Sequence, residues 1–248
     1  MERAGRLKHE PKPKSPACYR CHSPVTPRGE CGCRDGICLI HADGRDVLPL
    51  LEADIMVTDP PYGIHHSSRS GNEVAVVGET ATGRDAKRVL TAEHTSIRDE
   101  IVMIWGDLPA IVFGHWRAPR PEGTMMRLVW DKEIFGMGGV GQWRPSDEEI
   151  YILNWPNPKN NGGNHGSILR HKALRGKNRP NHPTPKPIGL MRELISNCPP
   201  GIILDPFAGS GTTGRACKDL GRRCIMIEIK EIYCRIAANR LRQEVFFA

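Results

Sequence analysis

The residues Asp59-Pro60-Pro61-Tyr62 place a carboxylate and an aromatic ring on either side of a double proline, directly after an apolar run that ends at Val57. Each proline fixes φ and removes a backbone donor, so neither a strand nor a helix continues through the pair. The segment is therefore expected to end a buried strand in a rigid turn. Such a turn can simply terminate the strand, or it can aim the carboxylate at a ligand. The four residues alone do not choose between these interpretations.

A glycine-rich loop at the other end of the sequence has the composition of a cofactor site. Asp205 ends a second apolar run and leads into Gly209, Ser210 and Gly211. Glycine lets a backbone approach a ligand closely, and the helix expected to follow begins with free N–H groups. A tight strand-to-helix turn would use the same residues. The next strand, however, ends 23 residues later on Glu228, where a carboxylate suits ribose hydroxyls. Together these features favour an adenosine-bearing cofactor.

Two close cysteine pairs near the N-terminus could hold a metal. Cys18 and Cys21 form a C-x2-C pair, and Cys31 and Cys33 form a C-x-C pair across a Gly/Pro turn. Four thiolates spaced in this way can surround Zn²⁺, with His22 as an alternative ligand. Four unligated thiols are the competing interpretation. No export signal precedes the pairs, which argues against disulfides. We expect a structural zinc knuckle over residues 18–36.

The formal net charge of +7 is unevenly distributed. From Ile150 to Arg192 the sequence has eight Lys and Arg residues and no Asp or Glu. A solvated loop would normally mix the two signs, so this stretch is expected to face a polyanion, with nucleic acid the obvious partner.

The elements that must position these groups alternate between strands and helices. Strands are expected at 37–41, 53–57, 110–114, 126–130, 149–154, 202–205 and up to 228; helices are expected after Asp43, over 96–108, over 188–198, after the glycine loop and up to about 242. In the second helix, Ile97, Ile101, Ile104 and Trp105 should share the buried side. The alternation predicts an α/β Rossmann-like fold with a mostly parallel twisted sheet and ligands at the carboxyl ends of its strands.

Length and composition set further limits. The 248 residues, 39% of them hydrophobic, suit one domain at 37–248, preceded by a flexible basic arm at 1–17 and interrupted by a mobile loop at about 64–92. No apolar run reaches the roughly 18 residues of a membrane helix. We expect no membrane partner, a cytoplasmic location and a monomer or homodimer. Trp116, Trp130 and Trp143 are expected in the core or as loop anchors.

Three motifs in order, "DPPYG" from Asp59, "HPTPKP" from His182 and "DPFAGSGTT" from Asp205, resemble the DNA amino-methyltransferases in their permuted β-type order. The similarity covers about Ile37 to Arg242, and Pro185 replaces a residue that is more often Gln or Glu in the family. The resemblance implies S-adenosylmethionine as the cofactor and double-stranded DNA as the partner. It also implies a cofactor site made of Asp43, Asp59, Thr184, Lys186, Asp205, Phe207, Gly209, Ser210, Gly211, Thr212 and Glu228.

The resemblance gives the tetrapeptide a catalytic role. The lone pair of an exocyclic base amine is delocalised into the ring, which makes it a poor nucleophile. If the Asp59 carboxylate and the Pro60 carbonyl accept its two hydrogens, the nitrogen becomes tetrahedral and its lone pair can attack a methyl group in line. Pro61 keeps the turn rigid, and Tyr62 offers a stacking face for a flipped base. Asp at the first position favours N6 of adenine, with N4 of cytosine and an inactive DNA-binding homologue as alternatives.

Target recognition is expected from the segment at about 156–181. Its cations should neutralise phosphates, and some of its polar residues should reach base edges. The residues expected to contact DNA are Lys159, Asn164, His165, Arg170, Lys172, Arg175, Lys177 and Arg179.

Overall fold

The computed structural model describes residues 15–61, 92–134, 143–156, 165–174 and 185–243, with the side chains of 92–96 outside this description. The described residues include the double proline, the glycine loop and both cysteine pairs. Several predicted site residues lie outside the described residues: Tyr62, Lys159, Asn164, Arg175, Lys177, Arg179 and Thr184. The predicted basic arm up to residue 14 and the predicted loop over 64–91 lie outside them too.

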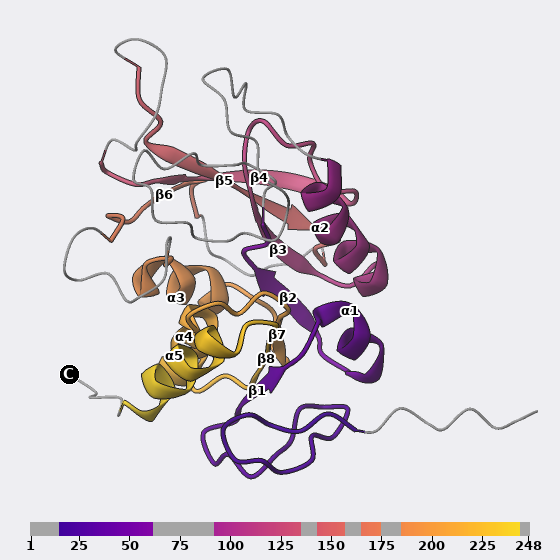
Figure 1. Cartoon of the computed structure of the whole chain (residues 1–248). Coiled ribbons are helices and arrows are strands. Elements are labelled where there is room, and N and C mark those ends of the chain that lie inside the picture. The colour runs from indigo at the N-terminus through magenta and orange to yellow at the C-terminus, as the bar shows by residue number, and fades with distance from the viewer. Residues whose placement is uncertain (1–14, 62–91, 135–142, 157–164, 175–184, 244–248) are drawn as a thin grey trace, which may run out of the picture.

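One eight-stranded sheet runs through the molecule in the order β1-β8-β7-β2-β3-β5-β4-β6 (Figure 1). The strands are β1 (Ile37–His41), β2 (Ile55–Thr58), β3 (Ala110–Gly114), β4 (Thr124–Asp131), β5 (Asp147–Leu153), β6 (Ile168–Arg170), β7 (Ile203–Asp205) and β8 (Cys224–Glu228). Pairing is parallel from β1 through to β3 and between β4 and β6, whereas β5 is antiparallel to both of its neighbours. The prediction of a mostly parallel sheet is confirmed.

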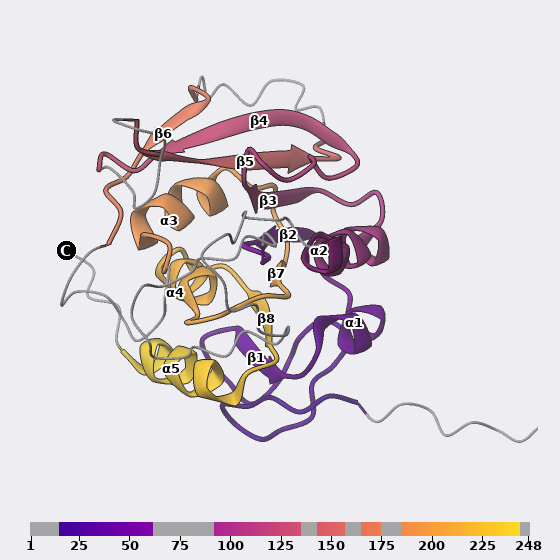
Figure 2. The same ribbon diagram turned by 45° about the horizontal axis from the view of Figure 1, so that its top comes forward.

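Helices cover both faces of the sheet (Figures 1 and 2). The face covered by α3 (Ile188–Ser196), α4 (Thr212–Asp219) and α5 (Glu231–Arg242) lies opposite the face covered by α1 (Gly44–Val47), the 3₁₀ turn η1 (Leu48–Leu50) and α2 (Ala92–Trp105). This three-layer arrangement follows from parallel strands, since each crossover must travel over one face of the sheet before the next strand begins.

The strand sequences explain how both faces become buried. In β1, Ile37 and Leu39 belong to the core beneath α3, α4 and α5, whereas Cys38 and Ile40 belong to the core on the α1 and α2 side. Side chains alternate between the faces of a strand, so a continuous apolar run fills both cores at once. The five residues of β8 are likewise all buried.

Two details differ from the sequence-based expectations. Ile104, predicted on the buried side of its helix, is 41% exposed, whereas Ile101 and Trp105 are buried. Ile101 and Trp105 lie four residues apart and share the buried side of α2, whereas Ile104 lies beside Met103, which is 75% exposed. The strand β6 was not predicted; it lies inside the basic stretch and pairs with β4. No helix among the described residues is long and apolar enough to cross a membrane.

Candidate active site

Asp59 follows the last residue of β2, at the edge of the sheet where the parallel strands end. Pro60 is buried and Pro61 is exposed, so the double proline leaves the sheet for the surface within two residues. The Asp59 side chain is 27% exposed. The strand brings this carboxylate to the position expected for a group that must remain accessible to a ligand while its backbone stays fixed.

Lys186 binds Asp59 directly. Its Nζ lies 2.8 Å from Asp59 Oδ2 and 2.9 Å from Glu148 Oε2. Glu148, just inside β5, also pairs at 3.0 Å with Lys132, which directly follows β4. A row of alternating charges therefore runs across the sheet edge from β4 to β2. The Lys186 side chain is 7% exposed and lies over the Phe113 ring, with Nζ 4.8 Å from the ring centroid.

The charges in this row support one another. Burial alone would lower the pKa of Lys186, but the Asp59 and Glu148 carboxylates outweigh it and raise the pKa above its usual value. Burial would likewise raise the pKa of Glu148, and the ammonium groups of Lys186 and Lys132 lower it. Lys186 is therefore a permanent cation facing Asp59, which favours the ionised, hydrogen-accepting form of that carboxylate.

Asp205 ends β7, the strand next to β2, but its surroundings are different. It is 3% exposed, and its carboxylate accepts hydrogen bonds from the Thr58 hydroxyl at 2.7 Å, from the Thr213 hydroxyl and from the Phe207 amide at 3.1 Å. Burial raises the pKa of Asp205 to about 6, although these three donors lower it. The carboxylate thus joins β2, β7 and the start of α4.

The glycine loop and Glu228 form one unit. Glu228, 7% exposed at the end of β8, accepts a hydrogen bond from the Gly209 amide at 2.8 Å and another from the Lys230 amide at 2.8 Å. Burial raises its pKa. Gly209 and Gly211 both have positive φ, at 50° and 77°. A Cβ on Gly211 would lie 2.7 Å from the Cβ of Ala237 in α5, so only glycine fits the turn.

The remaining predicted cofactor residues surround this loop or the end of β1. Ser210 and Thr212 are buried, and the Thr212 hydroxyl accepts a hydrogen bond from Arg240 at 2.6 Å. Phe207 is half-buried. Asp43 caps α1 by accepting a hydrogen bond from the Arg45 amide and pairs with the Arg45 side chain at 2.7 Å, which lowers the pKa of Asp43. The glycine loop and the ends of β1, β8, β7 and β2 together form one polar edge of the sheet, which runs from Asp43 to Asp59.

The four predicted metal ligands come together. The sulfur atoms of Cys18, Cys21, Cys31 and Cys33 all lie within 4.8 Å of one another. His22, the alternative ligand considered from the sequence, is exposed and does not belong to this group. Five cysteines remain: Cys38 is buried in the core on the α1 and α2 side, and Cys198, Cys217, Cys224 and Cys234 are buried in the core beneath α3, α4 and α5.

Only part of the predicted DNA-binding segment belongs to the described residues. His165, Arg170 and Lys172 are exposed there, and Arg170 lies 3.7 Å from Asp131. Lys186, counted among the eight cations of the acid-free stretch, faces the interior instead. Its charge is neutralised by carboxylates from other strands, so it does not add to a polyanion-binding surface.

The sequence did not reveal two features of this edge. Glu148 was not singled out, because an acidic residue beginning a strand looks like an ordinary surface charge. Trp116 was expected in the core or as a loop anchor, but it is 63% exposed directly after β3, with the Arg117 guanidinium 4.6 Å from its ring centroid. Trp143 is also exposed, and of the three tryptophans named from the sequence only Trp130 is buried.

Comparison with known proteins places this arrangement among DNA-modifying enzymes. A family model described as DNA methylase, for N6 and N4 methyltransferases, matches residues 115–239. The DNA adenine methyltransferase YhdJ of Escherichia coli (strain K12) is 41% identical over 96 residues, which are 37% of this chain and about a third (32%) of YhdJ.

Two solved structures share the fold. The complex of M1.HpyAVI with S-adenosylmethionine has a TM-score of 0.52 and 24% sequence identity, over 82% of this chain and 99% of that one. The cytosine-N4-specific PvuII DNA methyltransferase has a TM-score of 0.59 and 14% identity, over 85% of this chain and 88% of that one. Identities this low support the architecture alone.

Proposed function

We propose, from the premise that the chain belongs to the N6/N4 DNA methylase family, that it methylates the exocyclic N6 amine of adenine in duplex DNA. The observation that carries this proposal is the Asp59 carboxylate, placed at the end of β2 and ion-paired with the buried Lys186. The glycine loop and Glu228 stand along the same edge of the sheet.

The residues of this edge suit S-adenosylmethionine, which supplies a methyl group on a positively charged sulfur. Glu228 is a buried carboxylate at a strand end, as the binding of ribose hydroxyls requires. We assign the methionine end to the loop of Asp205, Phe207, Gly209 and Gly211, and the adenine amine to Asp43. The M1.HpyAVI structure, which contains this cofactor, has the same fold.

Asp59 and the Pro60 carbonyl accept the two hydrogens of the target amine in the proposed reaction. The amine nitrogen then forms a bond to the methyl carbon as the carbon–sulfur bond breaks, and the surplus proton on nitrogen leaves toward the Asp59 oxygen that already accepts it. An acceptor must be ionised to do this. Lys186 therefore acts as a positioning residue that keeps Asp59 charged and oriented, in place of the cofactor contact expected from the sequence.

Adenine is favoured over cytosine by Asp at the first motif position and by the similarity to the adenine methyltransferase YhdJ. Cytosine N4 is the alternative, because the cytosine-N4-specific PvuII enzyme shares the fold. Nucleoside mass spectrometry of DNA from cells that express the protein distinguishes the two. We expect N6-methyladenine that disappears in the Asp59→Ala variant. N4-methylcytosine in its place would refute the adenine assignment and retain the family chemistry.

Trp116 is proposed as a contact for DNA at the same edge. It follows β3, the neighbour of β2, and its exposed ring stacks with Arg117. An exposed base stacked on an aromatic ring contributes about 1–3 kcal/mol, so Trp116→Ala should weaken duplex binding about tenfold in a fluorescence anisotropy titration. Met103→Ala is the matched control, because Met103 is 75% exposed near the end of α2, before β3 begins, whereas Trp116 comes after β3. Equal binding by both variants would remove Trp116 from the interface.

A further inference from the structure

We propose that Cys18, Cys21, Cys31 and Cys33 bind one Zn²⁺ ion, and that this metal fastens residues 15–36 to the edge strand β1. The inference does not depend on which base the enzyme methylates. It concerns a segment outside the family match at residues 115–239.

The spacing of the sulfur atoms fits a tetrahedral metal site. A Zn–S bond of about 2.3 Å makes neighbouring sulfur atoms of a tetrahedron about 3.8 Å apart. The Sγ atoms of Cys18 and Cys33 are 3.8 Å apart, and all four sulfurs lie within 4.8 Å of one another. A disulfide would need about 2.05 Å. Four soft sulfur ligands at this spacing select Zn²⁺ over the oxygen-preferring cations.

The backbone around the sulfurs is shaped to bring the two pairs together. The first pair lies on a turn in which the Cys18 amide donates to the Ser23 carbonyl and the His22 amide donates to the Cys18 carbonyl. Gly32 separates Cys31 from Cys33 and faces this turn. A Cβ there would lie 3.0 Å from Ser23 Oγ and 3.4 Å from Cys21 Sγ. A side chain at 32 would therefore push the second pair away from the first.

The segment rests on β1 through its first ligand. Cys18 is fully buried and forms an antiparallel bridge with Ile40, and the Tyr19 amide donates to the Leu39 carbonyl at 2.6 Å. Val25 is the other fully buried apolar residue of 15–36. Both residues pack into the core on the α1 and α2 side, and two residues cannot form a separate core for a segment of this length. Small segments of this kind are usually held by a metal or a disulfide. The metal supplies that core here.

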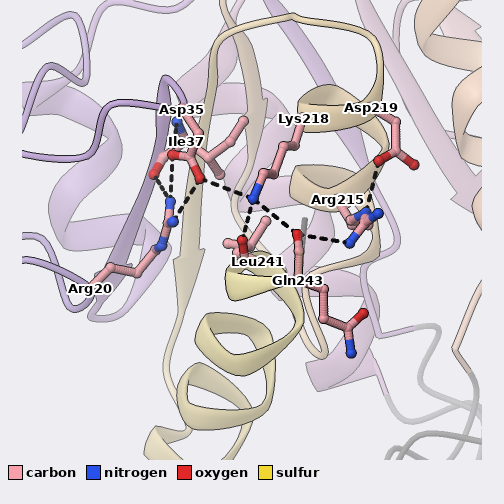
Figure 3. A network of polar contacts seen from close by, with 8 residues as sticks. All are labelled: Arg20, Asp35, Ile37, Arg215, Lys218, Asp219, Leu241 and Gln243. Atoms are coloured by element: carbon pink, nitrogen blue, oxygen red, sulfur yellow. Dashed lines mark hydrogen bonds and ion pairs between the residues drawn. The ribbon is translucent and has the colours of Figure 1, made fainter. Parts of the chain in front are cut away.

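Polar contacts then join the segment to the C-terminal helices (Figure 3). Arg20 makes a two-pronged ion pair with Asp35, at 2.7 and 2.8 Å, and donates to the Ile37 carbonyl. Lys218 of α4 lies 3.7 Å from Asp35 and donates to the Leu241 carbonyl in α5 at 2.6 Å. The residues that follow the last cysteine are thus fixed against two helices of the main fold.

The same segment reaches the proposed cofactor edge. The Tyr19 ring packs edge-on against His41, with centroids 5.9 Å apart. His41 ends β1 opposite Glu228 of β8, and its Nε2 contacts the Ile229 carbonyl at 3.0 Å. Loss of the metal should therefore loosen the strand ends that hold Glu228, as well as residues 15–36 themselves.

Metal analysis of the purified full chain tests the site directly. Inductively coupled plasma mass spectrometry should find one zinc per chain, and cobalt substitution should give the intense thiolate charge-transfer absorption of a tetrahedral four-sulfur site. Protein that is folded and free of metal, or that contains iron in its place, would overturn the assignment. These measurements use the unaltered sequence, so they decide the question even if cysteine variants fail to fold.

Variants then test the fastening role. Cys21→Ser with Cys31→Ser changes two partly exposed ligands, whereas Cys198→Ala removes a buried thiol that lies outside the cluster. The double variant should lose zinc, melt at least about 5 °C lower and become sensitive to protease within 15–36. Cys198→Ala should retain one zinc and the protease resistance of the wild type. Zinc retained in the double variant, or lost in Cys198→Ala, would contradict the ligand set.

Discussion

Two neighbouring strands bring an aspartate to the same edge of the sheet: Asp59 directly follows β2, and Asp205 is the last residue of β7. The surroundings of the two carboxylates differ. Asp59 after β2 faces a buried lysine and is 27% exposed. Asp205 at the end of β7 faces no lysine or arginine among the contacts described for it; its partners are two hydroxyls and an amide. Thr58 links the two aspartates: it directly precedes Asp59 in the chain, and its hydroxyl donates a hydrogen bond to Asp205.

The difference suits the two carboxylates to different proposed roles, Asp59 to the reaction and Asp205 to support of the glycine loop. A cation keeps a carboxylate ionised whatever its burial, whereas hydroxyl donors offset only part of the cost of burial. Asp59 is therefore suited to accept hydrogens from a substrate, and Asp205 is suited to hold the glycine loop in place. The Asp59 charge also raises the pKa of Asp205, so each affects the titration of the other.

The largest effect is expected from removing the cation. Lys186→Met leaves Asp59 and Glu148 without the charge between them, and breaking a buried ion pair costs about 3–5 kcal/mol. We expect chemical denaturation to show that loss of unfolding free energy. Any remaining activity should need a higher pH, because Asp59 loses the cation that favours its ionised form.

The double variant Lys186→Met with Glu148→Gln is the control for that result. Neutralising Glu148 removes one of the two carboxylates that lost their cation, so stability should recover in part while activity stays low. If Lys186→Met alone is as stable and active as the wild type, the proposed distinction between Asp59 and Asp205 fails.

A change at Asp59 should affect catalysis and little else. Asp59→Asn removes the charged acceptor in a partly exposed position, and loss of one preorganised polar contact to the reacting group typically lowers the rate about 100- to 1,000-fold. Transfer of labelled methyl groups to duplex DNA measures the rate, and calorimetry measures cofactor binding, which should persist. Asp54→Asn is a matched control, because Asp54 pairs with Arg28 just before β2. Comparable activity in Asp59→Asn and Asp54→Asn would rule out the catalytic role.

Asp205 should give the smallest effect, and one that depends on pH. Its pKa of about 6 in the folded protein lies above the usual value of 3.8. The unfolded chain therefore loses this proton first as the pH rises. The contribution of Asp205 to stability is complete below about pH 4 and is lost by about pH 6, at a cost on the order of 3 kcal/mol.

Asp205→Asn should remove that dependence. The gap in unfolding free energy between variant and wild type should shift in favour of the variant as the pH rises from 4 to 7. Other carboxylates titrate in both proteins, so their effects cancel in the difference. A difference that does not change with pH would mean that Asp205 is ionised throughout, like Asp59.

Sequence patterns predicted an element or a site correctly where a rule about neighbouring residues determines it. The boundaries of β3 were predicted correctly because a fully apolar run is bounded by Pro109 and by polar residues after Gly114. The glycine loop and the two cysteine pairs were found from spacing alone. The double proline was recognised as the end of β2 because proline cannot continue a ladder.

Contacts between distant strands could not be inferred in this way. Nothing in the sequence around Glu148 or Lys186 indicates that the two meet, because the pairing depends on β5 reversing direction beside β3. Strand β6 has three residues, and its extended conformation depends on its pairing with β4, which is distant in the sequence. Ile104 fits the apolar periodicity of α2, but which turn positions face the core depends on how the helix packs: Ile101 and Trp105 are buried and Ile104 is exposed.

The contacts among Asp35, Lys218 and Gln243 have a consequence for the order of the chain. Lys218 lies 3.7 Å from Asp35 and donates to the Gln243 carbonyl at 3.1 Å, so the residues before β1 and those after α5 share one neighbour. A short linker from residue 243 could therefore reach Asp35, just before β1. With the chain reopened between α3 and β7, the cofactor-binding elements would come first along the sequence and the catalytic strand second. The sheet would keep every neighbour it has now, so the three-dimensional architecture does not depend on which half is synthesised first.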